Sequence, residues 1–173
     1  MNHSPDRPRY DPELAALLQG NYGEAARAAR NLAVSLRRTE GIFPLTGDAI
    51  AALDEGAKER IDAFRVRFAD LQDLLVGKLF RDLLRLEEER IHSQLDIIHA
   101  MEKRGIVSSF EAWKGLRVIR NAFMHDDPEA PGERTEALNL AREGARQLLA
   151  TLERLRAYAI DRIGLPARTL PRP

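Results

Sequence analysis

Apolar residues recur every three or four positions through most of this chain, and this spacing restricts the chain to helical folds. The clearest run has its apolar positions at Ile50, Leu53, Ala57, Ile61, Phe64, Phe68, Leu71, Leu75 and Leu79. No segment shows the alternation of apolar and polar residues that is typical of a half-buried strand. The sequence therefore predicts an all-α fold, an antiparallel helical bundle with an extra N-terminal helix or helix pair.

Capping residues and helix breakers divide this pattern into segments. Asp11 before Pro12 is a typical helix start, Gly105 is a typical helix end, and Ser108 with Glu111 resembles a capping box. We expect helices over residues 11–19, 21–39, 46–86 with a kink near Gly77, 87–104, 108–125 and 135–163.

The two ends of the chain differ in composition from the rest. Residues 1–10 and 166–173 are rich in proline and arginine, so both are predicted to be flexible tails beside a single helical bundle domain over residues 11–165. The N-terminal residues lack the apolar centre of a signal peptide, and no stretch approaches the roughly 20 apolar residues of a membrane-spanning helix. We therefore expect a cytoplasmic protein with no membrane partner.

Charge and cysteine content exclude several classes of protein. The 27 basic and 27 acidic residues balance, which argues against coating nucleic acid by charge alone but leaves room for a small basic site. Cysteine is absent, so disulfides and thiolate metal sites are excluded. The chain also has no phosphate-binding glycine-rich loop and no metalloprotease motif, and we expect neither a cofactor nor a metal.

The helix predicted over residues 108–125 carries a polar stripe that is separate from its apolar one. Spacings of three, four and four residues place on one face the side chains of Lys114, Arg117, Asn121 and His125. A different face, which we expect to point into the core, holds Trp113, Leu116, Ile119 and Phe123. The polar stripe is therefore the best candidate for a functional surface.

Simpler explanations exist for the charged residues near the end of this helix when each is taken alone. A histidine at a helix C-terminus can simply cap the helix, since the helix dipole favours a cation there, and Arg120 can be an ordinary solvated arginine. What favours function is the combination of Arg120, Asn121 and His125 with the helix before them and the loop over 126–132 after them.

The run Arg120-Asn121-Ala122-Phe123-Met124-His125 follows a Gly105-Ile106-Val107 turn and precedes the final long helix. In this setting it resembles the core motif of HEPN domains, in particular of the HepT-like toxins of prokaryotic toxin–antitoxin pairs. The resemblance covers roughly residues 57–163. It implies a helical bundle that acts as a metal-independent endoribonuclease, with the motif helices of a homodimer forming one composite site. Carried over, Arg120 and His125 would be the catalytic pair and Asn121 their polar helper.

These residue types suit RNA cleavage. RNA supplies its own nucleophile, the 2′-hydroxyl, so the reaction needs a proton acceptor, a proton donor and positive charge on the phosphate. A histidine titrates near neutrality, and an arginine can hold a phosphate in a bidentate fork. Lys114 and Arg117 are predicted to bind the RNA substrate. On a regular helix Arg120 and His125 lie about 140° apart, which favours a site shared across a two-fold axis; fraying of the helix end is the competing explanation.

One position departs from the family pattern. HepT-like toxins paired with a nucleotidyltransferase antitoxin often carry, two residues after the histidine, a tyrosine that accepts an adenylyl group. This chain has Asp127 there, which excludes tyrosine-directed adenylylation at that site. The expected partner is a cognate antitoxin, either a nucleotidyltransferase-type protein that binds non-covalently or an antitoxin of another kind.

Other side chains offer weaker candidates. His92, Asp96 and His99 would share one face of the helix predicted over 87–104 and could bind a metal ion, although a polar helix face is the simpler interpretation. Arg65 and Arg67 could contribute to a phosphate-binding patch or could be solvated arginines.

Two other functions stay open beside the ribonuclease toxin. One is a catalytically silent HEPN-like bundle that serves as the binding or regulatory partner of a nucleotidyltransferase. The other is a helical interaction protein in which the motif is coincidental.

Overall fold

The computed structural model describes residues 10–46, 49–124 and 131–173, and in these ranges it contains helices and no strand. This confirms the all-α fold. The α-helices are α1 (Pro12–Arg38), α2 (Ala49–Ala52), α3 (Glu55–Leu74), α4 (Phe80–Leu86), α5 (Gln94–Lys103), α6 (Phe110–Met124) and α7 (Pro131–Tyr158). Two five-residue π-helical turns, Leu75–Leu79 and Ala159–Ile163, join α3 to α4 and extend α7.

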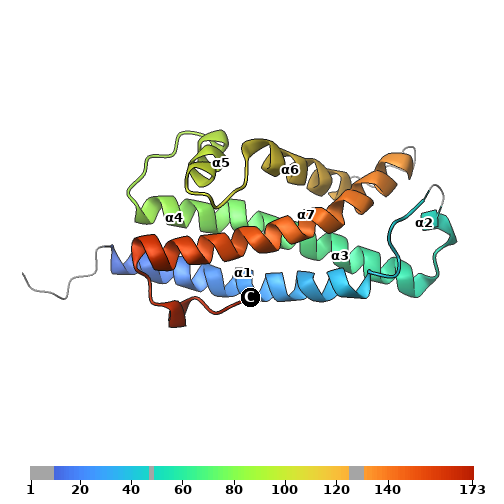
Figure 1. Cartoon of the computed structure of the whole chain (residues 1–173), viewed down its shortest axis with the longest axis horizontal. Helices are drawn as coiled ribbons and strands as arrows, with labels where there is room; N and C mark the ends of the chain where they lie inside the picture. The colour runs from blue at the N-terminus through green and yellow to red at the C-terminus, as the bar shows by residue number, and fades with distance from the viewer. Residues whose placement is uncertain (1–9, 47–48, 125–130) are drawn as a thin grey trace, which may run out of the picture.

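The long helices run side by side along the molecule. Figure 1 shows α1, α7 and the α3–α4 pair lying lengthwise, with α5 and α6 along one side of them. A buried apolar cluster joins all of these helices, and its largest fully buried side chains include Tyr22, Phe64, Phe68 and Phe80. The expected kink near Gly77 corresponds to the π-helical turn over Leu75–Leu79.

The N-terminal region is one helix rather than the two that we predicted. Asp11 caps it as expected, because its carboxylate accepts from the N–H groups of Glu13 at 2.8 Å and Leu14 at 3.2 Å. The helix then continues through Gly20 to Arg38. A glycine inside a helix costs only about 1 kcal/mol relative to alanine, and burial of Leu18 and Tyr22 on either side outweighs that cost.

The segment before α5 also differs from the prediction. The helix begins at Gln94, capped by Ser93, so residues 87–93 do not continue it. Tertiary contacts explain why: Arg104 forms ion pairs with Glu87, at 2.7 Å, and with Glu89, and the Tyr158 hydroxyl donates to Glu87 at 2.6 Å. These contacts hold Glu87 and Glu89 around the turn that ends α4, where Glu88 has a φ of 57°, and they raise the pKa of Arg104 against the opposing effect of burial.

Smaller corrections concern helix starts. α6 begins one residue later than predicted, with the Ser109 hydroxyl, not that of Ser108, accepting from the Ala112 N–H at 3.0 Å. Gly105 ends α5 as expected, with φ at 68°, and the tight turn after it buries Ile106 and Val107. α7 begins at Pro131, ahead of the expected Thr135.

The C-terminal residues are packed, whereas we expected a flexible tail over 166–173. The Leu170 side chain is fully buried, and its carbonyl accepts from Nε of Arg156 at 2.7 Å. In Figure 1 the last residues fold back along α1. Of the predicted N-terminal tail, residues 1–9 lie outside the described part of the chain. Among the described residues, no helix combines the length and apolar character needed to cross a membrane.

Tyr22 gives the first prediction. Its side chain is fully buried, and among the described residues its hydroxyl has no hydrogen-bond partner. Burial, and secondarily the charge of Glu153, raises the pKa of Tyr22 from 10.0 to about 12. Tyr22→Phe is expected to stabilise the fold by about 1 kcal/mol at neutral pH, because an unsatisfied polar group is removed.

The same variant should change the response to alkali. The unfolded phenol ionises first, so wild-type stability falls as pH rises from 10 to 12, by roughly 2–3 kcal/mol. Tyr22→Phe lacks this contribution. Urea unfolding at pH 7 and pH 11 measures both effects, with Tyr10→Phe as the control phenol removal. A Tyr22→Phe protein that loses stability with pH as steeply as the wild type would contradict the prediction.

Candidate functional site

Helix α6 separates a buried stripe from an exposed one. Trp113, Leu116, Ile119 and Phe123 are all buried in the apolar core, as their spacing predicted. Lys114, Arg117 and Asn121 are exposed on the other side of the helix. The polar stripe that the sequence indicated is therefore a surface feature along the described length of α6.

Helix α3 holds the second half of α6 through polar contacts. The buried Gln72 amide, with its nitrogen toward the Leu116 carbonyl and its oxygen toward the Arg117 N–H, makes both contacts at 3.2 Å. Nearer the end of α6, Arg65 donates from Nη2 to the Phe123 carbonyl, and its guanidinium lies 5.8 Å from the centre of the Phe123 ring. These contacts fix the position of the residues just before His125.

Neither arginine suggested for a phosphate patch is simply solvated. Arg65 also forms an ion pair with Asp62 at 3.2 Å, and Arg67 donates to the Ser35 hydroxyl at 2.7 Å. Arg65 therefore supports α6, and Arg67 joins α3 to α1.

Helix α7 approaches α6 closely at a glycine. A Cβ atom at Gly144 would lie 3.0 Å from Cδ2 of Leu116 and 3.1 Å from Cε2 of Phe68. The absence of a side chain lets α7 pack tightly against both residues. The candidate helix is thus fixed on two sides, by α3 and by α7.

Arg120 is anchored by a carboxylate that sequence reasoning did not identify. Its Nη2 lies 2.9 Å from Oδ2 of Asp73, and the two side chains are 31% and 54% exposed. Its Nε is buried, and no group among the described residues accepts a hydrogen bond from it. The ion pair with Asp73 therefore holds the guanidinium in place while part of it stays exposed, as a phosphate-binding arginine requires.

Two predicted positions cannot be placed beside Arg120. His125 and Asp127 lie outside the described residues; α6 is described to Met124. Asn121, next to Arg120, is exposed and one turn before the histidine position. The pairing of Arg120 with His125 remains a prediction.

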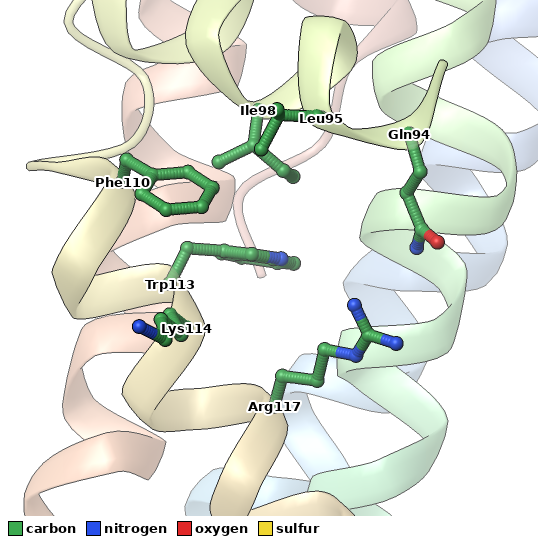
Figure 2. Close-up of a pocket in the computed structure, with 7 residues that line it drawn as sticks. All are labelled: Gln94, Leu95, Ile98, Phe110, Trp113, Lys114 and Arg117. Atoms are coloured by element: carbon green, nitrogen blue, oxygen red, sulfur yellow. The ribbon is translucent and has the colours of Figure 1, made fainter.

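The predicted substrate-binding residues border a pocket between α5 and α6. It is lined by Gln94, Leu95, Ile98, Phe110, Trp113, Lys114 and Arg117. Figure 2 shows the polar ends of Gln94 and Arg117 directed toward one another, whereas the Lys114 amine points away. That amine lies 3.8 Å from the Glu111 carboxylate. Arg117 and Lys114 therefore occupy different surroundings although they share a helix face.

The suggested metal stripe does not form on one helix. His92 precedes the Ser93 cap of α5, whereas Asp96 and His99 lie within the helix. His99 stacks on Phe110 with ring centres 4.8 Å apart, and its Nδ1 lies 3.5 Å from Glu102. In the described part of the chain no three acidic or histidine side chains are grouped to hold a metal ion. His99 contacts Phe110, the first residue of α6, whereas Arg120 lies about 15 Å further along that helix. His99 is therefore distant from the motif.

An apolar groove lies beside the motif, between α6 and α7. It includes Gly115, Val118, Ile119, Leu140 and Gly144. Val118 and Leu140 are large, exposed apolar side chains from the two helices. Exposed apolar surface of this kind is typical of contact sites for other proteins.

The residues that sequence reasoning missed are those of α3. Asp73 lies 47 positions from Arg120, so no local pattern connects them. Arg65 was a candidate for a phosphate patch, but its contact with Phe123, 58 positions away, could not be seen in the sequence. Gln72 offered one usable signal, since it is a polar residue four positions after Phe68, on the apolar face of the helix. Comparison with known proteins gives no match to a family model, to a curated protein or to a solved structure.

Proposed function

We propose that this chain is a HEPN-type, metal-independent endoribonuclease, the toxin of a toxin–antitoxin pair. Arg120 would stabilise the charge that develops on the scissile phosphate, and His125 would transfer the proton of the 2′-hydroxyl. Asn121 would contact the phosphate or orient the histidine. The observation that carries the proposal is Arg120 itself, anchored by Asp73 at 2.9 Å while its side chain stays 31% exposed.

The proposed active form is a homodimer. A regular helix would direct Arg120 and His125 about 140° apart, so we expect the residues of two copies to complete a site. The groove with Val118 and Leu140 lies beside the motif and supplies apolar surface for such a contact. A symmetric contact there would bring together two copies of the last turns of α6.

The proposed chemistry needs no metal. The His125 side chain of one copy would accept the proton of the 2′-hydroxyl, that of the other copy would donate a proton to the leaving 5′-oxygen, and Arg120 would stabilise the charge on the phosphate. The proposed partner in the cell is an antitoxin that covers this surface. Because position 127 is aspartate, inhibition by binding is favoured over modification of a tyrosine.

The experiment is cleavage of total RNA by purified, antitoxin-free protein in EDTA, with the wild type beside His125→Ala. We expect the wild type to cleave and the variant to lose at least about a hundredfold in rate, since general acid–base catalysis contributes this much. Light scattering and circular dichroism check that both proteins are folded dimers. If neither protein cleaves, the silent binding partner of a nucleotidyltransferase becomes the better proposal. If both cleave equally, the site is elsewhere.

A further inference from the structure

The pocket between α5 and α6 combines an apolar wall with a cation. Leu95 and Ile98 of α5 face Trp113 of α6, and Arg117 closes the side toward the motif (Figure 2). Behind the pocket, the indole of Trp113 packs on Phe80 with ring centres 5.1 Å apart. The wall is therefore fixed by the core and does not depend on a ligand to form.

The size of the pocket limits what can enter it. Its volume is about 120 Å³, well below the roughly 300–1,000 Å³ of sites that bury a drug-sized ligand. A single planar ring system fits this space better than a whole cofactor. The apolar wall suits the face of such a ring, and the Gln94 amide at the rim offers both a donor and an acceptor to its edge.

The charge at the rim indicates an anionic ligand. Arg117 forms no ion pair or hydrogen bond with its side chain among the described residues, and Figure 2 shows its guanidinium directed toward the Gln94 amide. Arg117 differs in this from Arg146, which pairs with the Glu143 carboxylate at 3.2 Å. A planar ring joined to a phosphate would contact the apolar wall, the Gln94 amide and the Arg117 guanidinium.

We infer that this pocket binds one nucleotide of the RNA substrate, with its base against Leu95, Ile98 and Trp113 and its phosphate on Arg117. The inference rests on the proposed ribonuclease function. Arg117 is four residues before Asn121 on the same helix face, about 6 Å along the axis, so a strand seated here runs toward the motif. Gln94 would read the edge of the base, which gives the enzyme a preference for particular bases near the cleavage site.

Trp113 makes the inference directly measurable because it is the chain's one tryptophan. The full-length protein is titrated with a 2′-O-methyl trinucleotide, which lacks the free hydroxyl needed for cleavage, while its fluorescence is recorded. Inorganic phosphate and the same trinucleotide without its central base are titrated in parallel. We expect a saturable change with the complete trinucleotide and at least a tenfold weaker response with the other two probes.

Paired variants test the assignment of the wall and the cation. Leu95→Glu and Arg117→Gln should each weaken binding at least tenfold. Leu17→Glu and Arg38→Gln, both on α1, are the controls, and their binding should stay within twofold of the wild type. Leu17 is matched to Leu95 because the two leucines are 44% and 50% exposed. Equal binding by Leu95→Glu, or an equal fluorescence change with phosphate alone, would overturn the inference.

Parallel cleavage assays separate this inference from the proposed function. If RNA is cleaved but Trp113 fluorescence does not respond to the trinucleotide, the pocket assignment is wrong and the proposed ribonuclease function stands. If Trp113 gives a saturable, base-dependent response but no RNA is cleaved, the pocket is supported as a nucleotide site and the ribonuclease function is wrong.

Discussion

Arg120→Ala is expected to lower the rate of RNA cleavage by about 10²–10³-fold, the loss that follows removal of one donor to a developing oxyanion. Stability should change little, because the ion pair with Asp73 is partly exposed and such pairs contribute roughly 1 kcal/mol or less. Arg120→Lys should recover only part of the rate, since an ammonium cannot form the same bidentate contact. Single-turnover cleavage of a short RNA measures the rates, and urea unfolding measures the stabilities.

The matched control is Arg146→Ala. Arg146 also pairs with a carboxylate on the surface, that of Glu143, but on α7. The Arg146→Ala variant should cleave RNA at the wild-type rate. Asp73→Asn tests the anchor: it leaves Arg120 in place and should give a rate between those of the wild type and Arg120→Ala. Wild-type cleavage by Arg120→Ala would remove this residue from the mechanism.

Phe68→Ala is expected to cost about 3–5 kcal/mol in the free energy of unfolding, the largest stability effect that we predict. Phe68 is fully buried, and its ring lies 5.5 Å from that of Phe123 in an edge-to-face contact. It also lies against Gly144 of α7, so its removal leaves a cavity where α3, α6 and α7 meet. Urea unfolding followed by circular dichroism gives the measurement.

Val66→Ala provides the comparison for Phe68, since it shortens an exposed side chain on the same helix and should change stability by less than about 0.5 kcal/mol. A loss for Phe68→Ala as small as that for Val66→Ala would mean that the three helices do not depend on this contact. The end of α6 should also loosen in Phe68→Ala, which faster hydrogen exchange near Phe123 would reveal.

Local signals predicted the parts of the fold that depend on neighbours in sequence. The Asp11 cap, the end of α5 at Gly105 and the buried stripe from Trp113 to Phe123 all follow from spacing and backbone preference. Gly20 was misread as a break because its cost is local, whereas the packing that outweighs it is tertiary. The charged segment from Glu87 favours a helix by composition, but its carboxylates are held by Arg104 and Tyr158.

The candidate site also contains some residues that local sequence signals predict and others that only tertiary packing brings there. Lys114, Arg117 and Asn121 share an exposed face because helical periodicity requires it. The anchor at Asp73 and the support from Gln72 and Arg65 come from α3, and only the packing of α3 against α6 brings them there. The buried Leu170 could not be recognised either, since a single leucine among prolines and arginines carries no periodic pattern.

In the proposed RNA complex, the pairing of Arg120 with Asp73 would also affect how binding responds to salt. Binding of a phosphate to a solvated arginine releases a condensed counterion from the nucleic acid, and this release makes affinity fall as salt rises. At Arg120 the cation is already partly neutralised by a carboxylate of its own chain. A phosphate bound by Arg120 would also lie near the Asp73 carboxylate, whose repulsion offsets part of the electrostatic gain. Salt dependence should therefore report chiefly on Arg117, and the arginine nearest the chemistry should contribute less to it.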